Sequence, residues 1–313
     1  MTRTVILASP HGFCAGVERA VEIANAMLDR YTKPVYCLRQ IVHNRQVIDA
    51  LIQKGMIFVQ DITEIPRGAT LLLSAHGVSP ATCEAARRLD LRVIDATCPF
   101  VTKVHHEVLR YARQGYSILL IGDRNHDEII GVASEAPDRV TIIENESDAR
   151  NVTVPDATKV AVMTQTTLSL DELSHVVAIL RERFPTLKTP AKMDICYATR
   201  NRQQAVRELA SRVDTFVILG AENSSNSNRL AKVARAEACP AYLVSTLAGL
   251  AGLTLDKVDT LGLTAGASTP EHFVRDAITQ LRTLGFDRVE DFVAVREDIH
   301  FALPRELRDP PTA

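Results

Sequence analysis

The chain has 313 residues, 46% hydrophobic and 24% charged, and its 36 basic side chains nearly balance 38 acidic ones, for a formal net charge of −2. At about 100–200 residues per domain, this length allows two or three compact units. The lack of a basic tract argues against nucleic acid and anionic membrane as partners. The first apolar stretch is too short for a signal peptide, and no segment reaches the roughly 18 apolar residues of a membrane span. We therefore expect a cytoplasmic protein whose six cysteines are reduced thiols.

Short β-branched runs alternate with helical patterns along the chain, which is typical of βα units around parallel sheets. The element order repeats three times. In each repeat a strand leads into a cysteine and a helix, and further strands follow. The strands before the cysteines are residues 5–8, 92–96 and 194–195, and the cysteines are Cys14, Cys98 and Cys196. The later strands are expected at 34–38, 117–121 and 215–219, near Met56, Val140 and Ala241, and at 70–74, 159–163 and 261–264.

This repeat predicts an α/β fold of three related parallel-sheet modules. The predicted boundaries are 14–97, 98–195 and 196–313, and we expect the N-terminal strand, within 1–13, to join the third module.

Polar residues stand at matching strand ends in the three modules. The second strand of each module leads to His43, His126 or Asn226, and the last leads to His76, Thr166 or Ser268. Parallel α/β sheets bind ligands outside the carboxyl ends of their strands. If the modules form a pseudo-threefold trefoil, we expect the three cysteines and this polar ring to face one central cavity.

Three matched thiols predict a metal cluster, although four cysteines per iron–sulfur cluster are usual. Three thiolates would leave one iron open to substrate. The alternative is that the thiols are buried and free, because cysteine packs as a small hydrophobe. We expect that for Cys37, Cys83 and Cys239, which do not share the strand-end position.

The polar ring predicts an anion site. The loops at 220–229 and 264–270 each join a strand to a helix and carry small hydroxyl and amide side chains. Helix N-termini with such donors suit phosphate, although ordinary helix capping explains either loop alone. Three histidines at matching strand ends favour a phosphate or diphosphate pocket.

Glu128 follows His126 by two residues. Beside bound phosphate and away from water, the pKa of its carboxyl should rise enough for proton donation near neutral pH. The alternative is a first-turn Glu that complements the helix dipole.

These residues resemble those of one enzyme family, the 4-hydroxy-3-methylbut-2-enyl diphosphate reductases, which complete the methylerythritol phosphate route to isoprenoids. The matching segments span nearly the whole chain: 12–17 (Gly-Phe-Cys-Ala-Gly-Val), 42–44 (Val-His-Asn), 74–78 (Ser-Ala-His-Gly-Val), 95–99 (Asp-Ala-Thr-Cys-Pro), 163–168 (Met-Thr-Gln-Thr-Thr-Leu), 194–198 (Asp-Ile-Cys-Tyr-Ala), 223–229 (Asn-Ser-Ser-Asn-Ser-Asn-Arg) and 264–268 (Thr-Ala-Gly-Ala-Ser).

The resemblance implies one oxygen-sensitive [4Fe–4S] cluster, bound by Cys14, Cys98 and Cys196 with an open apical iron, that can degrade to [3Fe–4S]. It implies a proton donor, Glu128, with His126 and Thr166 near the reacting end of the substrate. It also implies a set of diphosphate ligands: His43, His76, Ser224, Ser225, Asn226 and Ser268. The implied reaction removes the allylic hydroxyl as water and yields isopentenyl and dimethylallyl diphosphate. The implied electron donor is a ferredoxin or flavodoxin.

Two positions depart from the family pattern. His11 stands where the family usually has Arg, and the usual His-Pro-Glu reads His126-Asp127-Glu128. Losing the proline frees the backbone, and Asp127 adds negative charge near a diphosphate. We expect altered loop mobility or turnover and a retained reaction.

Two other functions remain open from the residues alone. One is a non-catalytic three-domain binder of a phosphorylated metabolite, with buried thiols and capped helices. The other is a hydrolase that uses Cys14 or Cys98 as nucleophile with a histidine, which requires only one thiol.

Overall fold

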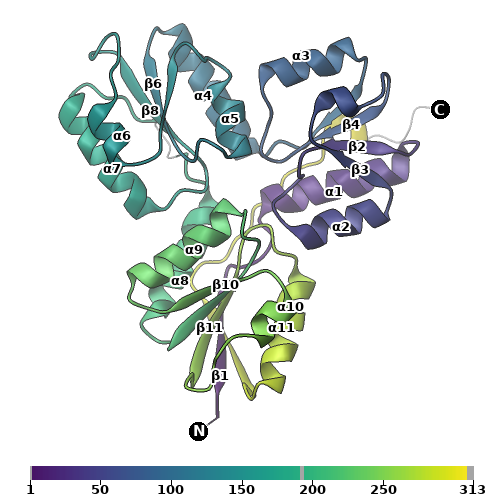
Figure 1. The fold of residues 1–313 in the computed structure, drawn as a ribbon, viewed down its shortest axis with the longest axis vertical. Coiled ribbons are helices and arrows are strands. Elements are labelled where there is room, and N and C mark those ends of the chain that lie inside the picture. Colours follow the sequence, from purple (N-terminus) through teal and green to yellow (C-terminus); the bar gives the residue numbers. More distant parts are fainter. Residues whose placement is uncertain (1, 191–193, 309–313) are drawn as a thin grey trace. The chain divides into compact units, whose positions relative to one another are not determined.

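The computed structural model describes residues 2–190 and 194–308. Met1 and residues 309–313, which the prediction places with the third module, and residues 191–193 of the predicted second module lie outside the described part. Within it, every strand pairing is parallel, and the strands form three sheets of five, four and three strands (Figure 1). The predicted α/β class with three parallel-sheet modules is therefore confirmed.

The chain divides into two compact units. Unit 1 comprises Met1–Val17, His43–Val47 and Tyr197–His300, and unit 2 comprises Glu18–Val42, Ile48–Cys196 and Phe301–Ala313. Unit 1 contains the five-stranded sheet, and unit 2 contains the other two sheets.

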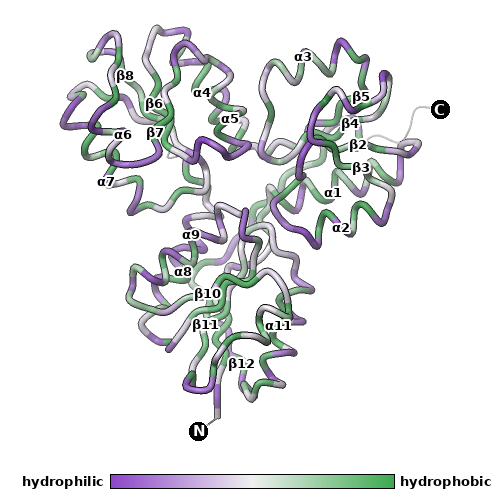
Figure 2. The backbone as a smooth tube through the Cα atoms, viewed as in Figure 1, coloured by the Kyte–Doolittle hydropathy of each residue, from purple (hydrophilic) through white to green (hydrophobic). Residues whose placement is uncertain are grey.

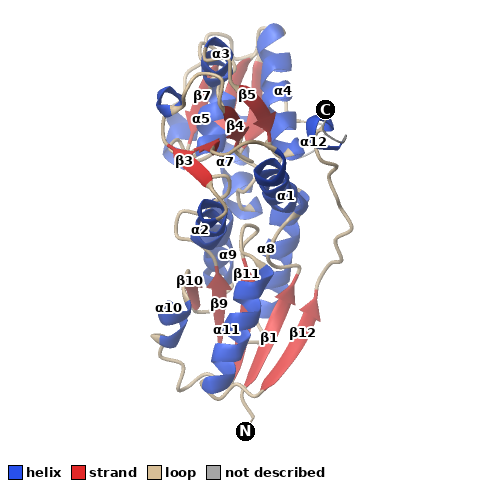
Figure 3. Ribbon diagram, turned by 90° about the vertical axis from the view of Figure 1, so that its right-hand side faces the viewer, coloured by secondary structure: helices blue, strands red, loops and turns tan. Residues whose placement is uncertain are grey.

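The five-stranded sheet of unit 1 includes the N-terminal strand. Its order is β10 (Ala241–Val244), β9 (Thr215–Leu219), β11 (Thr260–Ala265), β1 (Thr4–Ser9) and β12 (Arg288–Val293). Figure 3 shows β1 beside β12, and β1 also pairs with β11. The N-terminal strand thus lies in the sheet built by the C-terminal third of the chain.

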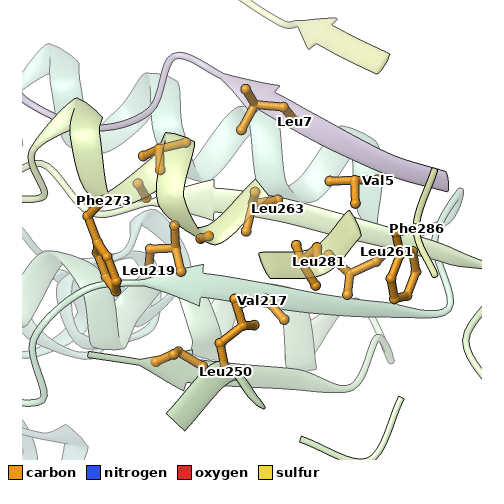
Figure 4. Packing of buried hydrophobic residues seen from close by; sticks show 14 of the residues in the cluster. Val5, Leu7, Val217, Leu219, Leu250, Leu261, Leu263, Phe273, Leu281 and Phe286 are labelled. Atoms are coloured by element: carbon orange, nitrogen blue, oxygen red, sulfur yellow. The ribbon is translucent and has the colours of Figure 1, made fainter. Parts of the chain in front are cut away.

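Apolar side chains cover both faces of this sheet, as expected for parallel strands flanked by helices. Along β9, Val217 and Leu219 pack on one face with α11 (Glu271–Thr283), as Figure 4 shows. The alternating residues Phe216 and Ile218 pack on the other face with α8 (Tyr197–Ala210) and α9 (Ser225–Ala236). Helices on both faces leave the strand ends as the places where polar side chains gather.

Unit 2 repeats this construction in two sheets. The four-stranded order is β3 (Met56–Val59), β2 (Val35–Leu38), β4 (Thr70–Leu73) and β5 (Arg92–Asp95). The three-stranded order is β7 (Val140–Ile143), β6 (Ser117–Ile121) and β8 (Val160–Thr164). Figure 2 shows the hydrophobic colour concentrated in the strands, and every residue of β6 and β8 is buried.

Most helices follow a strand along the chain. Three long helices lie mostly in unit 2: α1 (Ala15–Arg30), which begins in unit 1, α4 (Pro99–Arg113) and α7 (Leu170–Arg183). The shorter helices of the two units are α2 (Arg45–Gln53), α3 (Pro80–Arg88), α5 (Asp127–Ala133), α6 (Glu146–Asn151), α10 (Leu247–Ala251), α12 (Arg305–Arg308) and a 3-10 turn at Ile62–Glu64. No helix in the described ranges combines the length and apolar character that crossing a bilayer requires.

The predicted strand at residues 194–195 is wrong. Both residues lie in a bend, and the parallel pairing with β8 is made earlier, at Lys188, which bridges to Ala161. At the end of β8, the N–H of Thr164 donates to the Asp194 carboxylate at 3.1 Å. A side-chain acceptor therefore takes the place of a neighbouring strand.

Strand β12 is missing from the sequence-based expectations. Among the described strands it pairs with β1 alone, at the edge of the sheet, and it has partly exposed residues along its length. An edge strand needs no continuous apolar run, so the hydrophobic pattern that identified the central strands does not extend to it.

Phe286, just before β12, provides a test of the core of unit 1. Phe286 is fully buried, and the Arg3 guanidinium lies 3.9 Å from its ring centroid. Replacing Phe286 with Ala should lower the free energy of unfolding by about 3–5 kcal/mol, because it opens a cavity in the core. Urea denaturation measures this loss. Tyr242→Ala on β10, where the side chain is 40% exposed, is the control, and an equal loss there would contradict the prediction.

Candidate active site

The three cysteines occupy equivalent backbone positions. The N–H of each donates to a carbonyl two residues beyond the end of a strand: Cys14 to Ala267 after β11 (3.2 Å), Cys98 to Ala75 after β4 (3.0 Å) and Cys196 to Thr166 after β8 (3.0 Å). Each cysteine also immediately precedes a helix, α1, α4 or α8. The repeat inferred from sequence thus extends to individual hydrogen bonds.

This position suits thiolate ligands. The positive end of a helix dipole stabilises a negative charge placed at the N-terminus, and thiolates are the form that binds metal. Cys14, Cys98 and Cys196 are partly accessible, whereas Cys37 and Cys239 are buried. Burial raises the pKa of the thiols of Cys37, Cys83 and Cys239, which keeps them protonated. The donor set at the strand ends therefore fits an iron–sulfur cluster, and the other cysteines do not.

Six of the predicted site residues belong to unit 2, and we call them the unit 2 set: His76, Cys98, His126, Glu128, Thr166 and Cys196. His126 caps the N-terminus of α5, where its Nδ1 accepts from the Glu128 N–H at 3.1 Å. An accepting Nδ1 places the proton of the neutral ring on Nε2. The His76 and His126 rings meet edge to face with centroids 5.5 Å apart.

Glu128 and Thr166 form a buried pair. The Glu128 side chain accepts from the Thr166 N–H at 2.7 Å and contacts the Thr166 hydroxyl at 2.8 Å, and Glu128 is only 2% exposed. A hydroxyl can donate or accept, so this contact is compatible with either protonation state of the carboxyl. The Thr166 carbonyl also accepts from Cys196, so one residue connects the carboxyl to a cysteine segment.

Asp127, the departure from the family pattern, is paired with Arg39. The Arg39 guanidinium donates to the Asp127 carboxylate, and Arg39 follows β2 with a φ of 57°. Asp127 is the first residue of α5, so its charge also complements the helix dipole. Sequence reasoning missed Arg39. The signal was Asp127 itself, because an added carboxylate near an anion site calls for a cation.

The other departure, His11, lies in unit 1. Its Nδ1 is 3.2 Å from the Ala8 carbonyl, and its Nε2 is 3.4 Å from the Glu271 carboxylate at the start of α11. It therefore contributes to holding the turn that leads to Cys14.

The remaining predicted residues form the unit 1 set: Cys14, His43, Ser224, Ser225, Asn226 and Ser268. Ser224 caps α9, and its hydroxyl accepts from the Ser227 N–H at 3.3 Å. The Ser268 hydroxyl donates to the His43 carbonyl at 3.0 Å, which connects the loop after β11 to the segment before α2. Ser224 therefore caps α9, whereas the Ser268 hydroxyl makes a contact that helix capping does not explain.

Asn226 has an amide group oriented for a ligand. Its Oδ1 accepts from the Ala267 N–H at 2.9 Å, and this contact fixes which way the amide faces. Its Nδ2 is buried without a hydrogen-bond partner. A buried amide donor is normally satisfied, so this one is suited to an acceptor such as a phosphate oxygen.

Two further residues near the cysteines were not predicted from sequence as site residues. Asp194 is buried, and burial raises the pKa of its carboxyl, an effect that the ammonium of Lys103 opposes. The Tyr197 hydroxyl accepts from the Ala15 N–H at 3.2 Å, and burial raises the pKa of Tyr197 to about 12. Tyr197 therefore binds the first turn of α1 as a neutral phenol.

Within unit 2 the structure brings Glu128, Thr166 and Cys196 together, and within unit 1 it brings Ser268 to His43. The meeting of Cys14 with Cys98 and Cys196 at one cavity remains a prediction, since Cys14 belongs to unit 1 and the other two to unit 2.

Curated relatives match the chain over nearly its whole length. The 4-hydroxy-3-methylbut-2-enyl diphosphate reductase of Acidothermus cellulolyticus is 49% identical over 98% of this chain and 90% of its own. The reductase of the same name from Rhodococcus jostii is 49% identical over 98% of this chain and 91% of its own.

Solved structures give the same result. The E-1-hydroxy-2-methyl-but-2-enyl-4-diphosphate reductase from Plasmodium falciparum superposes with a TM-score of 0.94 at 36% identity, covering 98% of this chain and 97% of that one. A structure of (E)-4-hydroxy-3-methyl-but-2-enyl diphosphate reductase matches with a TM-score of 0.64 at 32% identity, covering 90% of this chain and 99% of that one. The sequence model of the family described as LytB protein matches residues 5–282. Together with the repeated cysteine position, these matches establish that the chain belongs to the LytB protein family.

Proposed function

We propose that this chain is a cytoplasmic reductase that converts 4-hydroxy-3-methylbut-2-enyl diphosphate to isopentenyl and dimethylallyl diphosphate, the terminal step of the methylerythritol phosphate pathway. In this reaction the allylic C–O bond breaks, and two electrons and two protons enter as the oxygen leaves as water. The observation that carries the proposal is the shared backbone position of three cysteines, each before a helix. Relatives that match nearly the whole chain carry the name of this reductase.

Cys14, Cys98 and Cys196 would bind one [4Fe–4S] cluster with an open apical iron. Their accessibility and their places at helix N-termini support this assignment. When bound, such a cluster supplies electrons and a Lewis-acidic iron, which side chains do not supply. A ferredoxin or flavodoxin would be the electron donor. We also keep the boundaries 14–97, 98–195 and 196–313 with 1–13 as the proposed modules.

The members of the unit 1 set other than Cys14 would bind the diphosphate together with His76. The unsatisfied Asn226 Nδ2 and the N-terminus of α9 are donors suited to phosphate oxygens. Ser224, Ser225 and Ser268 add hydroxyls, and His43 adds an imidazole. Because these groups sit at strand ends and a helix start, the backbone itself orients them.

Glu128 would deliver a proton to the departing oxygen, because hydroxide is a poor leaving group without one. Burial keeps water away from the carboxyl, and Thr166 holds it in place from two directions. The Thr166 hydroxyl can pass the proton on, since it both donates and accepts. His126, whose Nδ1 accepts from the Glu128 N–H at the start of α5, would orient the reacting end of the substrate.

Serine substitution of the cysteines separates this function from its alternatives. Cys14→Ser, Cys98→Ser and Cys196→Ser should each lower bound iron and activity severely, because each removes a ligand of the same cluster. Iron and sulfide analysis after anaerobic reconstitution measures the effect, with Cys83→Ser as control. A cysteine hydrolase predicts that at most one of the three changes is severe, and a metabolite binder predicts a wild-type protein without iron.

Replacing Glu128 with Gln tests the proton donor. We expect kcat to fall by about 10²–10⁴-fold, in the range of lost general acid catalysis, while iron content stays at the wild-type level. Anaerobic turnover with a reduced mediator measures kcat and KM. Glu146→Gln, a change on the exposed helix α6, is the matched control. A wild-type kcat in the Glu128 variant would sink the assignment.

Asp127→Pro restores the usual family residue and removes the partner of Arg39. Proline is well tolerated at the first position of a helix, so α5 should persist. We expect a measurable change in kcat or KM, because the segment that carries His126 and Glu128 loses its ion pair and gains a rigid residue. Steady-state kinetics of the two proteins provide the comparison, and identical parameters would contradict this expectation.

A further inference from the structure

A basic side chain follows each of the three cysteines at nearly the same distance along the chain. Arg19 and Lys103 come five residues after Cys14 and Cys98, and Arg202 comes six residues after Cys196. All three lie on the helix that the preceding cysteine begins, α1, α4 or α8.

Each of these cations contacts the segment just before a different cysteine. Arg19 Nη1 donates to the Thr97 carbonyl at 3.1 Å, next to Cys98. Lys103 Nζ donates to the Asp194 carboxylate at 3.1 Å, two residues before Cys196. Arg202 Nη2 donates to the Gly12 and Phe13 carbonyls at 2.9 and 3.3 Å, directly before Cys14.

These contacts follow a cyclic order. The helix after Cys14 contacts the segment before Cys98, the helix after Cys98 contacts the segment before Cys196, and the helix after Cys196 contacts the segment before Cys14. Every one of these contacts lies within a single unit. Three unrelated cations would have no reason to follow this order.

Arg19 and Arg202 are each held by a second group, and the carboxylate that Lys103 contacts is held by a backbone N–H. Arg19 Nε donates to the Ala302 carbonyl at 3.0 Å. The Asp194 carboxylate that binds Lys103 also accepts from the Thr164 N–H. Arg202 is 1% exposed and contacts the Glu297 carboxylate at 3.2 Å. These contacts orient the two guanidinium groups and the Asp194 carboxylate.

We propose that Arg19, Lys103 and Arg202 are positioning residues for the cluster ligands, each fixing the approach of one cysteine segment. This inference rests on the proposed function, because it takes the cysteines as ligands of one cluster. None of the three needs to touch substrate or cluster.

Lys103 is the best position for a test. Its side chain is 31% exposed, and it lines an open groove of about 690 Å³ together with Arg19, so its replacement leaves the apolar core intact. Lys103→Met removes the charge and keeps the length. Lys103→Arg restores a cation that can bind the Asp194 carboxylate. Arg110→Met, on the same helix, is the matched control because Arg110 contacts Glu107 and the Tyr111 ring on its own helix.

Two measurements report on the ligand positions. The first is the rate of iron release to a chelator after anaerobic reconstitution, with the electron paramagnetic resonance spectrum of the reduced cluster. The second uses apoprotein: a short dithiol-bridging reagent is added, and the Cys98–Cys196 bridge is quantified by mass spectrometry. The urea midpoint of each apoprotein shows whether it is folded.

For Lys103→Met we expect iron release at least about tenfold faster, as when groups that orient metal ligands are removed, with an altered spectrum and less bridging. Lys103→Arg should recover most of each signal, and Arg110→Met should match wild type. Wild-type release, spectrum and bridging in Lys103→Met would overturn the proposal. So would equal losses in Lys103→Met and Arg110→Met.

If Lys103→Met does not fold, Arg19→Met with Arg19→Lys as its rescue gives the same comparison at Cys98, and wild-type behaviour of that pair overturns the proposal. Neither measurement needs turnover. A wild-type protein that holds a cluster and fails to reduce the diphosphate would refute the proposed function and leave this inference standing. A wild-type protein that binds no iron would overturn both.

Discussion

A backbone hydrogen bond, made three times, sets the arrangement on which the remaining features depend. Each of Cys14, Cys98 and Cys196 donates its N–H to a carbonyl just beyond a parallel strand and then begins a helix. The strand is anchored in a sheet buried on both faces, so the acceptor carbonyl is rigidly placed. The sheet therefore fixes the backbone position of each cysteine at the start of a helix.

The same strand ends also place the polar residues that surround the cysteines. Thr166 is the clearest case, because its carbonyl accepts from Cys196 while its N–H and hydroxyl contact Glu128. In unit 1, Ala267 has the matching role: its carbonyl accepts from Cys14, and its N–H donates to Asn226. Thr166 therefore contacts both the proposed proton donor and one proposed cluster ligand. Ala267 likewise contacts both a proposed diphosphate ligand and another proposed cluster ligand.

The two departures from the family pattern are accommodated locally. Asp127 meets Arg39 at the start of α5, and His11 contacts Ala8 and Glu271 beside the turn before Cys14. In both cases a substituted polar side chain finds a partner on a neighbouring element. These contacts hold the segments that carry the neighbouring site residues, Glu128 and Cys14.

The local pattern of this sequence was enough to determine the parallel α/β modules and the equivalence of the three cysteines, because buried strands and helix faces leave regular apolar periods. It could not determine that residues 194–195 form a bend, since the acceptor for β8 there is the Asp194 side chain. Nor could it find β12, whose edge position requires no apolar run. Contacts such as Glu128 with Thr166 and Arg39 with Asp127 join residues far apart in the chain, and only the packing of sheets and helices brings such partners within hydrogen-bond distance.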